Sequence, residues 1–233
     1  MTRKQLKRLM ALLLGSVVGA AAPAVAADIA VKVQPALPVA YDAFSGPYIG
    51  INFGYGWNLG TSADAFRAVP FADLKASPQG VLGGFQLGYG ARVNQWLYLG
   101  LEGDADIAAM TGTSSIPGLI TTISKDTWMA SVRADVGVIP VGHALFYGTV
   151  GWGFGSGEFT VTDVTGNTAS LSPTQNGLVW GGGFKVPLSA NWVVDVKYLQ
   201  YDFGDVTVTN ANQFSFTTRD RIDVVRAGLN YKF

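Results

Sequence analysis

The sequence predicts an all-β protein, namely a transmembrane antiparallel up-and-down β-barrel of about eight strands. Three observations support this fold class. Segments of about ten residues alternate between large apolar and small or polar side chains, with the period of two that is typical of strands. The connections between these segments alternate between short and long, as they do in membrane barrels. Aromatic residues make up 12% of the chain and charged residues only 14%, with 30 glycines, which suits strands whose apolar face needs no solubilising charge.

The N-terminal segment has the three parts of a secretory signal peptide. Four basic residues among the first eight precede an apolar run over residues 9–22, and small residues follow at the positions that define cleavage. We therefore expect a signal peptide over residues 1–27, cleaved after Ala26 or Ala27. A membrane-spanning helix is the alternative, but this run is shorter than the roughly 20 apolar residues that such a helix needs.

A leader without alternation separates the signal peptide from the strands. Residues 28–45 contain Pro35 and Pro38, and they predict an extended periplasmic leader. The barrel domain is expected over residues 46–233. Without the four N-terminal basic residues, the chain keeps 12 of its 16 basic residues against 16 acidic ones, so no nucleic-acid partner is expected.

Histidine and cysteine usage argues against catalysis. The chain has no cysteine and a single histidine, His143, so thiolate metal sites, thiol nucleophiles and disulfides are excluded. An enzymatic barrel with a histidine-activated nucleophile is the rival function of a different class. Because His143 falls in a short turn, away from the expected substrate side, we predict that the protein is not an enzyme and that it holds no cofactor and no metal.

The strands follow one another in order along the barrel domain. They are expected at residues 46–57, 79–91, 96–107, 127–138, 144–155, 175–186, 191–202 and 223–233. Long loops are expected at residues 59–77, 108–125, 156–174 and 204–217, and short turns at residues 92–95, 139–143 and 187–190. In each strand one face collects large apolar side chains, whereas the other collects glycines and charges, as expected for a lipid-facing surface around a crowded lumen.

The last strand explains how the sheet would close. Leu229, Tyr231 and the terminal Phe233 are apolar, and they alternate with polar or small residues such as Arg226 on the other face. A strand that ends the chain must be paired on both edges or remain an exposed edge. We expect it to pair with residues 46–57 and to close the barrel.

Several stretches resemble a known family. Residues 41–55 read YDAFSGPYIGINFGY, residues 179–186 read VWGGGFKV, residues 191–204 read NWVVDVKYLQYDFG and residues 226–233 read RAGLNYKF. These stretches are similar to the Omp25/Omp31-like porin-family surface proteins of the α-proteobacterial outer membrane. The resemblance implies an integral protein of the cell outer membrane, in contact with lipid and lipopolysaccharide. It supplies no catalytic residues, and relatives include proteins described as porins, surface antigens and haem binders.

The end of the chain also resembles a signal. Phe233, Tyr231 and Leu229 are similar to the terminal pattern by which the barrel-assembly machinery recognises outer-membrane barrels. We therefore expect that machinery as a partner, and a monomeric product, with an oligomer left open.

Charged side chains recur on the predicted lumen face. They are Glu102, Asp104, Asp106, Arg133, Asp135, Lys185, Asp195, Lys197 and Arg226. An ion-pair network that plugs a narrow barrel is the first interpretation, because about eight strands leave an interior that side chains fill. A selective ion-conducting pore is the second. A divalent-cation site at the three acids of residues 102–106 is a further alternative, with basic neighbours as the simpler explanation.

Tryptophans mark the expected membrane interfaces. Trp57, Trp96, Trp128, Trp180 and Trp192 all fall near the ends of predicted strands, where an interface girdle is expected. The predicted function is a structural or surface role in the envelope, similar to that of a surface antigen. A narrow porin for ions or small solutes is the alternative, and a loop-mediated adhesin or haem-binding protein is the second alternative.

Overall fold

A computed structural model describes the barrel domain in segments. The described residues are 42–58, 77–116, 120–140, 144–163, 166, 168–172, 174–209 and 215–233. The predicted signal peptide, most of the predicted leader, His143 and the predicted loop at residues 59–76 lie outside these segments. Within them, no helix is long and apolar enough to cross a membrane.

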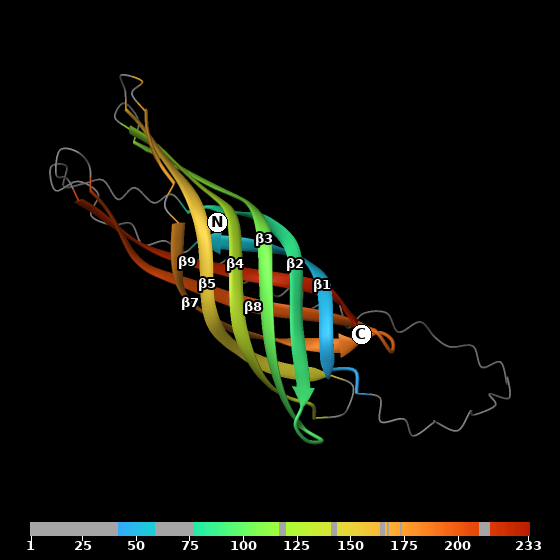
Figure 1. Cartoon of the computed structure of the whole chain (residues 1–233). Helices are drawn as coiled ribbons and strands as arrows, with labels where there is room; N and C mark the ends of the chain where they lie inside the picture. Colours follow the sequence, from blue (N-terminus) through green and yellow to red (C-terminus); the bar gives the residue numbers. More distant parts are fainter. Residues whose placement is uncertain are drawn as a thin grey trace, which may run out of the picture. The chain divides into compact units, whose positions relative to one another are not determined.

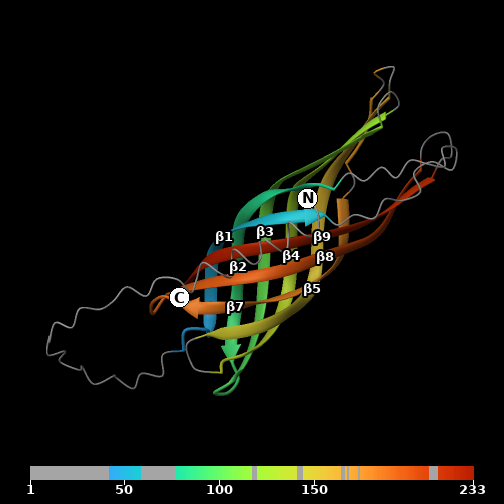
Figure 2. The ribbon, with the colours of Figure 1, turned by 180° about the vertical axis from the view of Figure 1, so that it is seen from behind.

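The described segments form antiparallel strands of one sheet. The strands are β1 (Gly46–Asn58), β2 (Gln79–Arg92), β3 (Leu97–Ile116), β4 (Ile120–Val138), β5 (Leu145–Asp163), β6 (Thr168–Leu171), β7 (Thr174–Pro187), β8 (Trp192–Thr209) and β9 (Ser215–Lys232). Each strand pairs with its neighbours in the order β4-β3-β2-β1-β9-β8-β7-β5, and β4 also pairs with β5. These eight strands therefore close into a barrel, which confirms the predicted fold class (Figures 1 and 2). The short strand β6 pairs with the far end of β5 alone.

The predicted closing seam is present. β9 pairs with β1 from Tyr48 opposite Lys232 to Asn58 opposite Ile222. β9 also pairs with β8, so both of its edges are occupied. The last strand therefore has no exposed edge along this seam.

The structure corrects three of the predicted long loops. Residues 108–125 belong almost wholly to β3 and β4, which pair up to Ile116 opposite Ile120. In the same way β5, β6 and β7 occupy most of residues 156–174, and β8 and β9 occupy much of residues 204–217. These stretches lack an apolar face because they extend past the lipid-facing band, but they are rich in β-branched threonine and keep their ladder hydrogen bonds. The two ends of the barrel are called here the short-turn end, where β2 meets β3, and the long-strand end.

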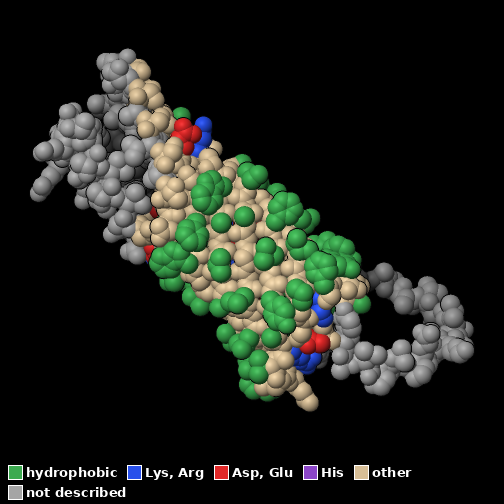
Figure 3. Space-filling model, in the orientation of Figure 1, with side chains coloured by type: hydrophobic (Ala, Val, Ile, Leu, Met, Phe, Trp, Pro, Cys, Tyr) green, Lys and Arg blue, Asp and Glu red, His purple; other side chains and the backbone are tan. Residues whose placement is uncertain are grey.

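The outer surface is apolar around the middle of the barrel. Figure 3 shows hydrophobic side chains spread over the centre of one face, with charged side chains mainly toward its two ends. Large side chains that point outward include Phe53, Phe85 and Ile107, which are 64%, 69% and 79% exposed. Such exposure is unfavourable in water, and it matches the outward apolar band of a barrel in lipid.

The lumen contains three layers of side chains. An apolar layer near the long-strand end consists of Leu82, Ala108, Met110, Met129, Val179, Leu199, Tyr201, Phe203, Ile222 and Val224. A smaller apolar layer near the short-turn end consists of Phe44, Tyr98, Ile139, Leu145, Tyr147 and Val193. Between them lies a charged layer. The sequence predicted charges and small residues in the lumen, and the two apolar layers are present in addition to them.

Candidate functional site

The charged layer contains all nine side chains that the sequence placed on the lumen face. They come from β3, β4, β7, β8 and β9, where the period of two turns every second side chain inward. None of the nine residues is more than 7% exposed, and Asp195 is fully buried. The layer therefore brings together five carboxylates and four bases in a space closed to water.

Glu102 is the centre of one half of this layer. Its Oε1 lies 2.6 Å from Nη2 of Arg133, and its Oε2 lies 3.2 Å from Nζ of Lys185. Lys197 forms a third ion pair with Oε1. The hydroxyl of Tyr48 donates a hydrogen bond of 2.7 Å to Oε2. One carboxylate thus joins three bases from three different strands.

Arg226 and Asp104 form the other half. Nη1 of Arg226 lies 2.8 Å from Oδ1 of Asp104 and 2.7 Å from Oδ2 of Asp106. Asp104 also pairs with Arg133, which links the two halves. Nη2 of Arg226 donates a hydrogen bond of 2.7 Å to the hydroxyl of Tyr201.

The two remaining carboxylates lie at the margin of the layer. Oδ2 of Asp195 is 2.8 Å from Nζ of Lys197, whereas Oδ2 of Asp135 is 3.5 Å from Nζ of Lys185. Neither oxygen of Asp135 accepts a hydrogen bond. Even this carboxylate has a base within ion-pair distance, so each of the five acids of the charged layer lies beside at least one of its four bases.

Uncharged polar side chains complete the network, and the sequence analysis did not select them as site residues. Gln86 donates from Nε2 to Oδ1 of Asn230 over 2.6 Å, and its Oε1 accepts from Nζ of Lys197 over 3.1 Å. Ser131 donates from Oγ to Oδ2 of Asp104 over 2.7 Å. The same alternation that selected the charges places these three residues inward, so the pattern contained the signal.

The side chains of the charged layer are arranged to fill the lumen and not to coordinate a metal ion. The acids at 102, 104 and 106 are each engaged by Arg or Lys, and the described residues include no group of three or more His, Cys, Asp or Glu arranged for a metal ion. Space is tight, because a Cβ atom at Gly54 would lie 2.9 Å from Cγ of Arg226. Burying charges is costly unless they are paired, and pairing here is dense.

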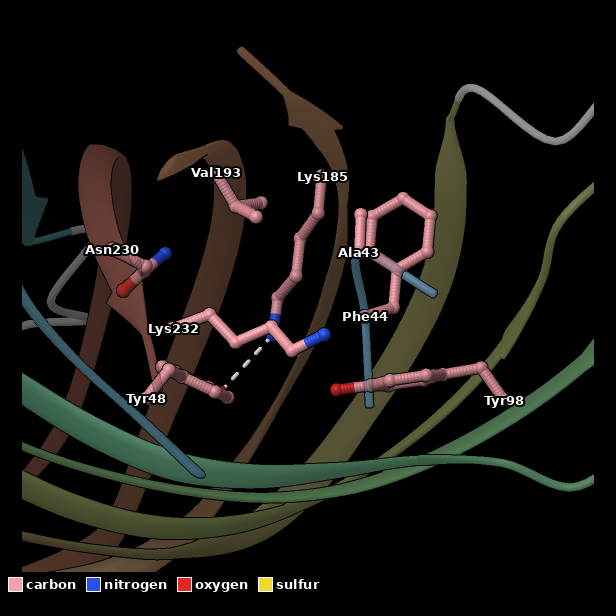
Figure 4. Close-up of a pocket in the computed structure, with 8 residues that line it drawn as sticks. All are labelled: Ala43, Phe44, Tyr48, Tyr98, Lys185, Val193, Asn230 and Lys232. Carbon is pink, nitrogen blue, oxygen red and sulfur yellow. Dashed lines mark hydrogen bonds between the residues drawn. The ribbon is translucent and has the colours of Figure 1, made fainter. Parts of the chain in front are cut away.

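The short-turn end of the lumen is covered by residues just before β1. Phe44 and Ala43 are 7% and 6% exposed, and they line a cavity of about 20 Å³ beside Lys185 (Figure 4). This volume holds about one water molecule. Oδ1 of Asp42 accepts hydrogen bonds of 3.2 Å from the backbone nitrogens of Phe44 and Ser45, which fixes the turn. Part of the segment that the sequence assigned to the leader therefore covers the barrel opening.

Tyrosines surround the ammonium group beneath this cover. Nζ of Lys185 lies 4.8 Å from the ring centre of Tyr48, 4.9 Å from that of Tyr147 and 5.8 Å from that of Tyr98. Nζ of Lys185 also donates a hydrogen bond of 3.1 Å to the Tyr48 hydroxyl, drawn in Figure 4. These contacts, together with the ion pair to Glu102, fix the position of the ammonium group.

The predicted tryptophan girdle is only partly at strand ends. Trp96 and Trp192 lie where β3 and β8 begin, and Trp57 lies near the end of β1. Trp128 is well inside β4, because this strand begins at Ile120 and not at the predicted residue 127. Trp180 is in the middle of β7, whose bounds nearly equal the predicted ones, so Trp180 does not lie near a strand end. All but Trp57 are at least 40% exposed. Their role at a membrane interface stays a prediction.

Comparison with known proteins agrees with this architecture over nearly the whole chain. The family model described as outer membrane protein beta-barrel domain matches residues 10–233. The chain belongs to this family. The 31 kDa outer-membrane immunogenic protein of Brucella melitensis biotype 1 is 31% identical, over 91% of this chain and 95% of that protein. The 25 kDa outer-membrane immunogenic protein of Brucella abortus biovar 1 is 28% identical, over 91% of this chain and 92% of that protein. The family resemblance and the outer-membrane location predicted from the sequence are thereby confirmed.

Two solved structures of outer-membrane proteins align with this chain. The outer membrane protein OprG from Pseudomonas aeruginosa is 15% identical and aligns with a TM-score of 0.47, covering 82% of this chain and 97% of that chain. The attachment invasion locus protein Ail of Yersinia pestis is 17% identical, with a TM-score of 0.40, over 80% of this chain and 99% of that chain. Both are likenesses of fold alone.

Proposed function

We propose that this outer-membrane β-barrel protein has a structural and surface role and that its interior does not conduct ions. The observation that carries the proposal is the charged layer, in which nine buried side chains from five strands fill the lumen between two apolar layers. A conducting path would need water at this level. Opening one would separate ion pairs that are buried at both partners, which costs several kcal/mol for each uncompensated charge.

The number of strands supports the same conclusion. A barrel of about eight strands has an interior that side chains can fill completely. In this chain the cover formed by Phe44 and Ala43 adds a second barrier at the short-turn end, which faces the periplasm in membrane barrels. Two independent barriers therefore stand in series along the lumen.

The long-strand end supports the surface part of the proposal. β3, β4 and β5 extend well past the apolar band, and β6 adds to β5 there (Figure 1). In membrane barrels this end faces outward from the cell. The Brucella relatives are named as immunogenic proteins, and a sheet that projects from the membrane would be accessible to other molecules in the same way.

Single-channel recording of the mature protein in planar bilayers tests the proposal. We expect no reproducible conductance steps from the wild-type protein, with a wide porin in the same bilayer as the positive control. Phe44→Ala should also stay closed, because the charged layer remains intact when the cover is removed. Steady steps from the wild-type protein would instead support the narrow porin, and steps from Phe44→Ala alone would identify the cover as the barrier.

A further inference from the structure

Two buried carboxylates lie apart from the charged layer, at the long-strand end. Asp126 on β4 is 8% exposed, and Asp220 on β9 is 9% exposed. Three strands separate β4 from β9 in the sheet order, so the two residues lie on opposite sides of the lumen and not on one ladder, and the charge of Asp220 acts on Asp126 across it. Asp126 lies nearer the long-strand end than the exposed Trp128 of its strand, and Asp220 lies nearer that end than the exposed Val225. The pair is therefore located above the lipid-facing band.

Amide side chains from two further strands face this pair. Nδ2 of Asn58, at the end of β1, donates a hydrogen bond to Oδ1 of Asp220. The amide of Gln175, near the start of β7, also hydrogen-bonds to Asp220 and favours its charged form. Four strands of the barrel thus supply polar groups to one place.

Two oxygen atoms at this place lack a donor. Oδ2 of Asp126 and Oε1 of Gln175 are buried, and neither has a hydrogen-bond partner in the described part of the chain. A buried acceptor without a partner is unfavourable, and more so when the group is charged. The carboxylate of Asp126 is more than nine-tenths buried, so solvent supplies little compensation.

Among the side chains that the structure describes, which do not include those of residues 205–219, no Lys or Arg lies within ion-pair distance of Asp126 or Asp220. Every acid of the charged layer, by contrast, has a base within 3.5 Å. The nearby Arg221 instead pairs with Asp202 over 3.0 Å. Burial, and then the charge of Asp220, raise the pKa of Asp126 to about 7, and burial raises the pKa of Asp220.

We propose that Asp126, Asp220 and Oε1 of Gln175 form a binding site for a divalent cation of the calcium class. Calcium takes six to eight oxygen ligands from carboxylates, amides and water, in flexible geometry, which suits two carboxylates and an amide oxygen at a solvent-facing end. Magnesium demands stricter octahedral geometry. The cation would supply the missing positive charge and tie β4, β7 and β9 together. This site is independent of whether the lumen conducts.

Thermal unfolding of the mature protein, refolded in detergent without lipopolysaccharide and stripped with EDTA, tests the site. At fixed pH and ionic strength, we expect CaCl₂ at about 100 times the dissociation constant to raise the wild-type melting temperature by roughly 5–10 °C. Asp126→Asn should lose this shift. In EDTA it should melt at least as high as the wild-type protein, because the substitution removes a repulsion, and this result shows that the variant folds.

Asp223→Asn is the matched control. Asp223 is a buried acid on the same strand as Asp220, but its Oδ1 accepts hydrogen bonds of 2.8 Å from both Tyr198 and Gln200. This variant should keep the calcium shift. As a second readout, Tb³⁺ luminescence excited through tryptophan should appear in the wild-type protein, fall when Ca²⁺ is added, and be absent in Asp126→Asn.

Three outcomes would overturn the site. The first is a wild-type melting temperature that does not respond to CaCl₂. The second is an equal response in Asp126→Asn. The third is an equal response to NaCl at matched ionic strength, which would indicate screening of charge and not binding.

Discussion

Two groups of buried charge in this barrel differ in how they are compensated. In the charged layer, bases from β4, β7, β8 and β9 surround the carboxylates of β3, and each acid has a base in contact. At the long-strand end, Asp126 and Asp220 have amides near them but no base in the described segments. The first group has its counter-charges within the chain. In the second group the described side chains supply no base, and a proton or a bound cation would supply the missing positive charge.

The largest expected effect comes from breaking the charged layer. Arg226→Ala removes the base that pairs with Asp106 and one of the two that pair with Asp104, and it leaves the charge of Asp106 buried, so we expect a loss of about 3–5 kcal/mol in the free energy of unfolding. Denaturant unfolding of the protein in lipid vesicles measures this loss. Arg221→Ala is the control, because Arg221 forms its ion pair at the outer surface with 40% of its side chain exposed, and it should lose at most about 1 kcal/mol. Equal losses of unfolding free energy in the two variants would contradict the prediction that the buried ion pairs of Arg226 stabilise the protein more than the exposed ion pair of Arg221.

The pH dependence of stability tests the second group of buried charge, Asp126 and Asp220. The pKa of Asp126 is raised from 3.8 to about 7, so the folded protein holds the proton more tightly than the unfolded chain between these values. The contribution is favourable in acid, and the free energy of unfolding should decline as pH rises toward 7, by at most about 1.4 kcal/mol per pH unit for this group. Unfolding in EDTA from pH 5 to pH 8 should show a shallower decline for Asp126→Asn. Parallel curves would contradict this prediction.

A smaller loss of unfolding free energy is expected from crowding the charged layer. A Cβ atom at Gly228 would lie 2.7 Å from Nε2 of Gln86 and closer still to Oδ1 of Asp195. Gly228→Ala should therefore displace buried polar groups and cost about 1–3 kcal/mol of unfolding free energy. At Gly103, the nearest heavy atom to such a Cβ is 3.7 Å away, so Gly103→Ala is a matched control with little loss. If only Gly103→Ala lost a large part of the unfolding free energy, the prediction that side chains are crowded around Gly228 in the lumen would be wrong.

The smallest effect on stability is expected at the chain end. Phe233 is 71% exposed and its ring lies 5.3 Å from that of Tyr231, so little buried area depends on it. Phe233→Ala should leave the free energy of unfolding within about 0.5 kcal/mol of the wild-type value. It should slow insertion by the barrel-assembly machinery, as measured by the appearance of the folded, heat-modifiable band on a gel. Insertion at the wild-type rate would contradict the role of Phe233 as an assembly signal.

The sequence alone determined the fold class, the closing seam and the identity of the charges in the lumen. These features depend on local alternation, because a period of two assigns each side chain of a strand to one of two faces. Thus Glu102, Arg133 and Arg226 could be placed inside without any tertiary information. The alternation also turned Gln86 and Asn230 inward, although their hydrogen bonds were not foreseen.

The tertiary structure decided which of the inward side chains meet. Whether Arg226 contacts Asp104 or Asp195 depends on the stagger of strands around a closed barrel, which no single strand records. For the same reason, only the closed sheet places Asp126 and Asp220 on opposite sides of one lumen. The polar ends of β3, β4, β5, β8 and β9 were predicted as loops, since beyond the lipid no apolar face marks them, and the pairing of neighbouring strands is what keeps them extended.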